Sequence, residues 1–187
     1  DHVNLILRYI PYVQTNFVLG MDTDRGAEPF ELTKQFLDRT PGAFPGYSLL
    51  TAFGEAAPLN LEYQRAGRVL PFPFHFLNNN QAMNVRPKNY SWREFYDHVV
   101  DLTCHSFSWK AIFNRCRASG GVVPRWMHLL RSVSSEGFGR RKYYAEVSRR
   151  LDVDPEFAPY FEQQTDRLPR FYSEIIRKDL GPLWDLL

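Results

Sequence analysis

The sequence predicts a mixed α/β protein in which two parallel strands joined by a helix precede a mainly helical C-terminal region. Two short apolar runs, residues 13–19 and 47–53, are each followed by glycine, as expected for strands. A helical pattern separates them, and a strand–helix–strand unit of these lengths makes a parallel crossover. No strand pattern follows residue 86. We therefore expect an α/β part over residues 1–86 and a helical extension over residues 87–187.

The first predicted strand covers residues 13–19, VQTNFVL, and ends at Gly20. A helical pattern over residues 2–10 precedes it and stops at Pro11. Phe17, Val18 and Leu19 are consecutive apolar residues. Strands of parallel sheets are usually buried on both sides, so we expect both faces of this strand to be covered.

A helix opens at Glu28-Pro29 and closes at Pro41-Gly42, which places it between the two strands. Beyond the second predicted strand, residues 59–66 form a short helical pattern. Prolines alternate with aromatic residues over 69–77, which predicts a loop lying on an apolar surface.

The C-terminal region begins with a capping box, Ser91 and Glu94. Helical patterns then follow over residues 109–116, 124–133, 140–151, 155–164 and 169–178. Five aromatic residues at helical spacing are expected to form a core: Trp92, Tyr96, Trp109, Phe113 and Trp126.

Composition indicates a soluble chain. Hydrophobic residues make up 44% of its 187 residues. No run approaches the roughly 18 apolar residues that a membrane helix needs, so no membrane span is predicted. Cys104 and Cys116 stand twelve residues apart without ligand-like neighbours, which favours ordinary thiols in a reduced, cytoplasmic setting. The chain begins with Asp1 and holds only two predicted strands, which leave sheet edges unpaired. We therefore expect further strands upstream in a longer polypeptide.

The net charge of +2 is unevenly distributed. Residues 110–150 carry 10 basic and 2 acidic side chains, whereas residues 151–187 carry 4 basic and 8 acidic ones. This basic block could meet nucleic acid or a membrane surface, or pair with acidic residues of its own polypeptide. We favour intramolecular pairing and do not expect nucleic acid as the partner.

Candidate binding residues gather on the two strands and at their carboxyl ends, where open α/β sheets and barrels bind ligands. Gly20 would let the backbone approach a ligand or simply form the turn. Asp22 could bind a hydroxyl group, and Asp24 is expected to cap the next helix. Polar residues on the strands could line a barrel lumen and contact a small-molecule substrate: Gln14, Asn16, Ser48 and Thr51.

No metal site and no catalytic residue is predicted. His98, Asp101 and His105 share one side of a helix, but no fourth ligand accompanies them. His75 lies between two phenylalanines and is expected to be a packed imidazole.

Four segments, in order, resemble the C-terminal third of radical SAM proteins, above all those with an N-terminal cobalamin-binding domain: FVLGMDTD, SLLTAFG, LNLEYQRAGRVL and VRPKNYSWREFY. The resemblance covers about residues 3–115. It implies that the two strands close a partial radical-SAM-type (β/α) barrel whose other strands lie upstream. The implied cofactors are SAM, a [4Fe–4S] cluster and cobalamin, and the implied chemistry is reductive cleavage of SAM, often followed by methyl transfer.

Cofactor contacts are expected at Asn16 and Gly20, which align with the adenine-contacting motif of the family, and at Asp22, whose carboxylate could bind a hydroxyl group. Substrate contacts are expected at Gln14, Ser48 and Thr51, whose side chains could line the barrel lumen. Two departures matter. The three-cysteine cluster motif is absent from this chain, so it cannot hold the cluster alone. The adenine-contacting motif of the family matches only at Val18 and Gly20. The alternative is a non-catalytic helical module whose basic block, residues 110–150, binds nucleic acid or another acidic partner.

Overall fold

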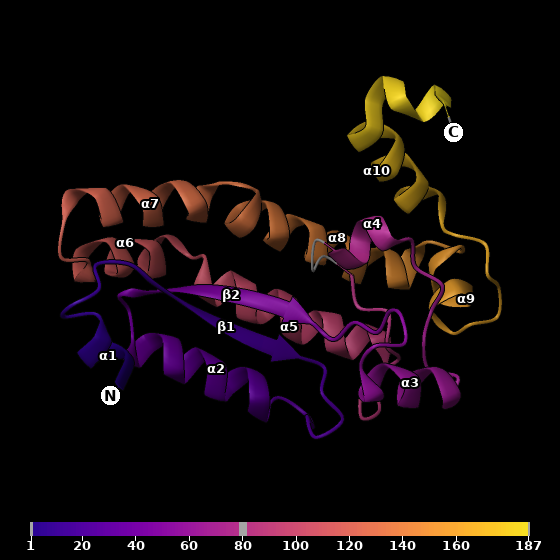
Figure 1. The fold of residues 1–187 in the computed structure, drawn as a ribbon, viewed down its shortest axis with the longest axis horizontal. Coiled ribbons are helices and arrows are strands. Elements are labelled where there is room, and N and C mark those ends of the chain that lie inside the picture. The colour runs from indigo at the N-terminus through magenta and orange to yellow at the C-terminus, as the bar shows by residue number, and fades with distance from the viewer. Residues whose placement is uncertain (1, 79–81, 187) are drawn as a thin grey trace. The chain divides into compact units, whose positions relative to one another are not determined.

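A computed structural model describes residues 2–78 and 82–186 of the chain and has a mixed α/β fold that is mostly helical (Figure 1). The described residues form one sheet, which has two parallel strands. The chain divides into two compact units, one of residues 1–49 with 87–149 and one of residues 50–86 with 150–187. Each unit draws on both regions expected from the sequence. The boundary at residues 86 and 87 stays a prediction.

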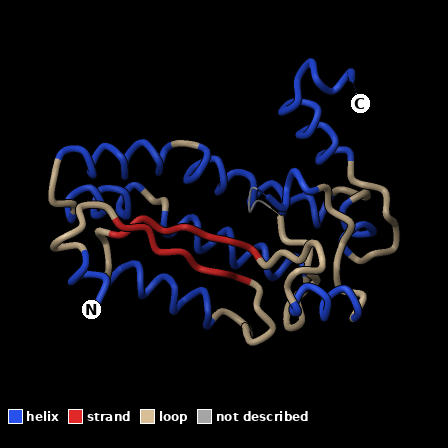
Figure 2. The backbone as a smooth tube through the Cα atoms, in the orientation of Figure 1, coloured by secondary structure: helices blue, strands red, loops and turns tan. Residues whose placement is uncertain are grey.

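The first unit contains α1 (His2–Ile6), β1 (Val13–Leu19), α2 (Glu28–Arg39) and β2 (Ala43–Leu49). It continues with α5 (Trp92–Ser106), α6 (Trp109–Ala118), α7 (Val122–Val133), the π-helical turn η1 (Ser135–Gly139) and most of α8 (Arg140–Val153). Figure 2 shows the two strands side by side, with α2 along one side of them and α7 along the other. The prediction of a parallel strand–helix–strand unit is confirmed.

The second strand begins earlier than predicted. β2 covers Ala43–Leu49 rather than residues 47–53, and it includes Pro45 and Gly46. Both residues are weak strand formers, so the sequence pattern favoured the apolar run that begins after them. Pro45 is tolerated in an edge strand, where its missing N–H costs no ladder bond.

The prediction that both faces of β1 are covered is wrong. Side chains alternate across a strand, and the alternate residues Gln14, Asn16 and Val18 are exposed. Val18 keeps 55% of its surface accessible. Within the described residues β1 pairs only with β2, so its other edge also lacks a strand partner.

Helix predictions in the C-terminal region are confirmed to within a few residues. Ser91 caps α5, accepting a bond from the Glu94 amide at 3.2 Å. The expected aromatic core is only partly correct: Trp92 and Tyr96 are buried, whereas Trp109, Phe113 and Trp126 are 67%, 66% and 58% exposed.

The second unit contains α3 (Pro58–Arg65), α4 (Phe74–Asn78), α9 (Phe157–Phe161), α10 (Arg170–Leu180) and the 3-10 helix η2 (Gly181–Leu186). Its core is an aromatic cluster with ring centroids 5.0–6.2 Å apart, made of Phe72, Phe76, Phe157, Tyr160, Phe161 and Tyr172. The buried amide of Asn84 holds the chain at Ala52, donating to its carbonyl at 2.7 Å and accepting from its N–H at 2.8 Å. The predicted loop over 69–77 therefore includes a short helix, α4, and contributes buried aromatic residues.

Candidate functional site on the open face of the sheet

The open face of the sheet carries three of the four polar residues that the sequence placed on the strands, Gln14, Asn16 and Ser48. The parallel register sets Gln14 opposite Phe44, Asn16 opposite Gly46 and Val18 opposite Ser48, all on the side away from α2. We call these six residues the open face. Only Phe44 among them is fully buried, and Gly46 and Ser48 are half-buried.

Gln14 and Asn16 form a polar pair that lies along the strands. The Gln14 amide nitrogen donates to Asn16 Oδ1 at 2.6 Å. Gly46 makes room for this pair: a Cβ at that position would lie 2.2 Å from Asn16 Oδ1 and 2.7 Å from Gln14 Nε2. Any side chain at residue 46 would therefore displace both amides.

Arg131 on α7 contacts the open face at the N-terminal ends of the two strands. Its guanidinium lies 4.2 Å from the centroid of the Phe44 ring and donates to Gln14 Oε1 at 2.8 Å and to the Tyr12 hydroxyl at 2.6 Å. Its Nε donates to Glu136 at 2.9 Å. These contacts hold the Gln14 amide from one side while Asn16 holds it from the other, so the pair is oriented before any ligand binds.

His128 lies beneath this end of the face with no exposed surface. Its ring is 4.6 Å from the Tyr12 ring centroid and 6.2 Å from that of Phe44. Within the described part of the chain neither ring nitrogen makes a hydrogen bond of normal geometry. Burial, followed by the charges of Arg115 and Arg131, lowers the pKa of His128 to about 4, and the nearby Gly42 backbone offsets this only in part. The imidazole is therefore neutral at pH 7.

The turn after β1 uses Asp24 differently from the prediction. Its carboxylate accepts from the backbone N–H groups of Gly20 and Met21, at 3.1 and 3.0 Å, and α2 has no side-chain cap. The expectation that Asp24 caps α2 is wrong. Gly20 has φ 91°, a left-handed conformation that favours glycine, and its N–H is engaged by Asp24, so the turn itself explains this residue.

Asp22 lies in the same turn and not on the open face. The Asn89 amide donates to the carbonyls of Asp22 and Asp24, at 2.9 and 2.8 Å, and so fixes the loop to the start of α5. Thr51 lies beyond the end of β2 and belongs to the second unit. The structure thus brings Gln14, Asn16 and Ser48 to one surface and places Gly20 and Asp22 in the turn after β1.

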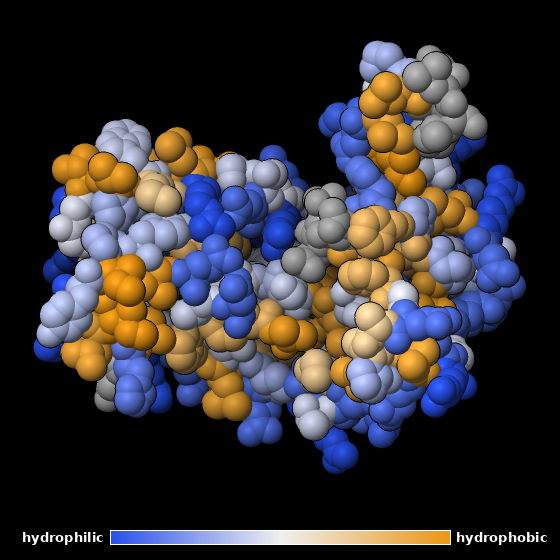
Figure 3. Space-filling view, viewed as in Figure 1, coloured by the Kyte–Doolittle hydropathy of each residue, from blue (hydrophilic) through white to orange (hydrophobic). Residues whose placement is uncertain are grey.

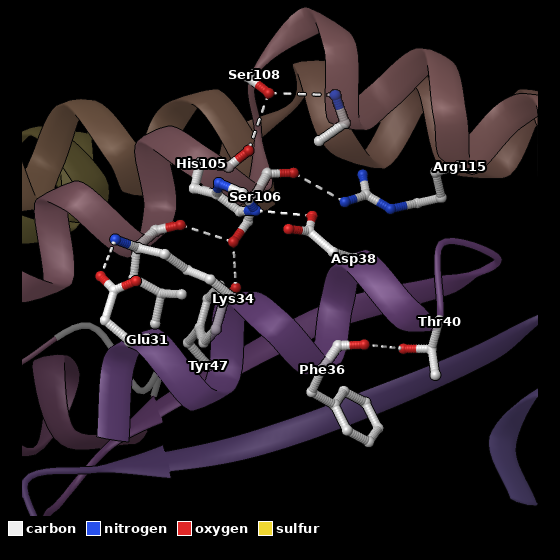
Figure 4. Close-up of polar contacts among 12 residues, drawn as sticks. Glu31, Lys34, Phe36, Asp38, Thr40, Tyr47, His105, Ser106, Ser108 and Arg115 are labelled. Carbon is white, nitrogen blue, oxygen red and sulfur yellow. Dashed lines mark hydrogen bonds and ion pairs between the residues drawn. The ribbon is translucent and has the colours of Figure 1, made fainter. Parts of the chain in front are cut away.

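The helix-covered side of the sheet holds a separate polar cluster (Figure 4). His105 contacts Asp38 at 3.0 Å, and the buried Tyr47 hydroxyl lies 2.5 Å from Ser106 Oγ. Arg115, which is 4% exposed, donates to the Ser106 carbonyl at 2.8 Å. Burial lowers the pKa of Arg115 to about 10, which still leaves it charged at pH 7.

A cavity of about 50 Å³ adjoins this cluster and is lined by Asp38, His105, Asn114 and Arg115 among others. Sites for cofactors and drug-sized ligands measure roughly 300–1,000 Å³, so this cavity is too small for one. The cluster fastens α2, α5 and α6 to the sheet, and the open face remains the better candidate site.

No metal centre is found among the described residues, where no three His, Cys, Asp or Glu side chains come together. His98 stacks on Phe30 at 4.8 Å and His105 pairs with Asp38, so the two histidines serve packing and pairing. Cys104 and Cys116 are unpaired thiols. These residues do not fit a [4Fe–4S] cluster. Of the helices that the structure describes, none combines the length and apolarity needed to cross a bilayer.

Comparisons with known proteins give no relative: no protein-family model matches the chain, and neither a curated protein nor a solved structure does.

Proposed function

We propose that this chain is the C-terminal part of a radical SAM enzyme, contributing the last two strands of a partial barrel and the helices that follow them. The observation that carries the proposal is the parallel β1–α2–β2 unit, in which the face turned away from α2 exposes Gln14, Asn16 and Val18 along β1 and is contacted by α7 at the end near Phe44. In (β/α) barrels the helices lie outside, and the opposite face of each strand points into the lumen.

The unpaired edge of β1 supports the same proposal. A two-stranded parallel sheet buries too little surface to be complete, and parallel sheets normally have both faces covered. Here the described residues supply β1 with a partner on one edge only. Upstream strands of the same polypeptide would pair with the other edge and close the lumen over Gln14 and Asn16.

Within this proposal the open face contacts the small-molecule substrate and the adenosine of SAM. Asn16 and Gln14 offer amide donors and acceptors at positions fixed by Arg131, and Ser48 adds a hydroxyl. Gly20 and Asp22 would act by shaping the turn at the strand end, and the substrate contact expected of Thr51 rests on the sequence pattern alone. The radical chemistry would come from SAM, an upstream [4Fe–4S] cluster and, in the cobalamin type, a bound cobalamin. This chain orients ligands and excludes water.

The test uses the whole protein encoded by the natural reading frame, reconstituted with iron and sulfide under anaerobic conditions. We expect release of 5′-deoxyadenosine from SAM after reduction. Asn16→Ala and Gln14→Ala should each weaken SAM or substrate binding about three- to ten-fold, the value of one hydrogen bond. Gln35→Ala, an exposed amide on α2, is the matched control and should change neither quantity.

A reading frame without an upstream three-cysteine motif would refute the proposal. So would a reconstituted protein that leaves SAM intact. The interaction-module alternative predicts instead an intact protein without cofactor and with steeply salt-dependent binding to nucleic acid.

A further inference from the structure

The outward side of α7 is apolar along its whole length. Pro124, His128 and Ser132, spaced four residues apart, form the buried row of this helix. The opposite side presents six apolar residues that are 39–69% exposed: Val122, Val123, Trp126, Met127, Leu130 and Val133. A helix on a protein–water boundary normally carries polar residues there. In Figure 3 hydrophobic residues come to the surface along α7.

α6 extends this surface. Trp109, Phe113 and Cys116 share one row of α6, at spacings of four and three residues. Cys116 Sγ lies 3.6 Å from the Arg125 carbonyl of α7, so this row adjoins α7. Trp109 and Phe113 are 67% and 66% exposed, and the Trp109 ring packs against Phe138 at 5.3 Å. We call the eight exposed apolar residues of α6 and α7 the hairpin surface.

The charged residues of the two hairpin helices themselves are all basic. Residues 109–133 contain no Asp or Glu and five basic residues. Arg115 is buried and Arg131 pairs with Glu136, which leaves Lys110, Arg117 and Arg125 exposed on the two helices. Whatever covers the surface must therefore be apolar at its centre and anionic at its rim.

We propose that the hairpin surface binds the headgroup region of an anionic phospholipid membrane. Interfacial helices combine a large apolar face containing Trp, Phe or Leu with flanking Lys and Arg, and they lie in the plane of the membrane. α7 has 12 residues and is about 18 Å long, too short for a hydrocarbon core of about 30 Å but suited to an in-plane position. Exposed Trp109 and Trp126 match the preference of tryptophan for the membrane–water boundary.

Two other occupants fit less well. A second copy of the chain would bring the basic rims of two hairpins together, and like charges at an interface oppose association. Nucleic-acid interfaces are polar and strongly basic, whereas eight large apolar side chains dominate here.

The experiment measures sedimentation of the 187-residue chain, and of the whole protein if the reading frame is longer, with two kinds of vesicle. One is phosphatidylcholine alone, and the other is phosphatidylcholine mixed with phosphatidylglycerol. We expect binding to the mixed vesicles, much weaker binding to the neutral ones, a blue shift of tryptophan emission on binding, and weakening with added salt.

Paired variants separate the apolar contribution from the charge. Trp126→Ser with Leu130→Ser should lower the partition coefficient at least about ten-fold, because two large apolar side chains would no longer be buried in the membrane boundary. Leu32→Ser, at a 55% exposed leucine of α2, is its control and should have no effect. Lys110→Glu with Arg117→Glu should abolish the preference for anionic vesicles, and Arg39→Glu on α2 is the matched control.

Several outcomes would overturn the proposal. These are absence of binding to mixed vesicles by the whole protein, binding that the Trp126 and Leu130 substitutions leave unchanged, and dimerisation that those substitutions abolish without any vesicle binding. Equal retention on nucleic acid and on vesicles, unaffected by the apolar substitutions, would indicate charge alone and count equally against it.

Discussion

The two faces of the sheet differ although they alternate along the same two strands. Tyr47, on the helix-covered face, is 2% exposed, and its ring lies 5.9 Å from that of Phe17 and 6.5 Å from that of Phe107. Ser48, the next residue, is half-buried on the open face opposite Val18. The first face is a core, sealed by α2 and α5. The second is a preorganised surface, because Arg131 and Gly46 position the side-chain amides of Gln14 and Asn16 while leaving them exposed.

The largest expected difference is in the loss of stability caused by alanine at Tyr47 and at Ser48. Tyr47→Ala should lower the free energy of unfolding by about 3–5 kcal/mol, because a buried aromatic ring is replaced by a cavity. Ser48→Ala should change it by less than about 0.5 kcal/mol. Urea unfolding of both variants measures the contrast, and similar losses at the two positions would show that the open face is covered in solution.

The second prediction concerns pH at the buried end of the open face. The folded pKa of His128 lies near 4, below the ordinary value of 6.5, so the unfolded chain takes up the proton first. The contribution of His128 to stability is complete above pH 6.5 and is lost as the pH falls toward 4. The loss is at most about 3 kcal/mol.

His128→Phe tests this prediction. Phenylalanine keeps the ring contacts with Tyr12 and Phe44 and removes two buried nitrogens that lack good partners. The variant should therefore be at least as stable as the parent at pH 7 and lose less stability between pH 6.5 and 4. Carboxylates titrate in both proteins, so the difference between the two curves isolates His128. Parallel curves would contradict the prediction.

A smaller loss of stability is expected on substitution of Arg131, which links α7 to the open face. Arg131→Met should cost about 1–2 kcal/mol, because it removes the cation–π contact with Phe44 and the bonds to Gln14 and Tyr12. Chemical shifts of the Gln14 side-chain amide should move as its anchor is lost. An unchanged amide signal would show that Gly46 and Asn16 suffice to orient it. Arg39→Met, on the exposed side of α2, serves as the control.

The smallest effect on folding is expected on the polar pair itself. Gln14→Ala and Asn16→Ala replace exposed side chains and should each change stability by less than about 0.5 kcal/mol. Their effect should fall on ligand binding instead. A loss of stability above 1 kcal/mol in thermal unfolding would assign the pair to the fold rather than to a site.

Local patterns predicted most of the secondary structure. The Ser91 capping box and Pro29 in the first turn of α2 marked helix starts within a residue or two. The predicted bounds of β2 were four residues too late. Pro45 and Gly46 in its first half are weak strand formers, whereas the apolar residues that follow the strand have the composition of one. In that case the parallel pairing with β1 overrode weak strand propensity.

The site was predicted in part. Gln14 and Asn16 were recognisable because polar residues alternate with apolar ones on a strand. Arg131 and Gly46 were not, because they reach the pair through α7 and β2. His128 was not either, because it packs on Tyr12 and Phe44, of which Tyr12 is more than a hundred residues away in the sequence. An arginine and a histidine three residues apart on an apolar helix were the available signal.

The order of helices and strands and the polar alternation along β1 follow from the amino-acid sequence, since they depend on neighbours a few residues apart. Which side chains are buried under other elements does not follow from the sequence. Tyr96 and Trp126 both sit at helical spacing among apolar residues, yet one is fully buried and the other is 58% exposed. Burial depends on which element packs on each face, and that arises only when distant segments of the chain come together.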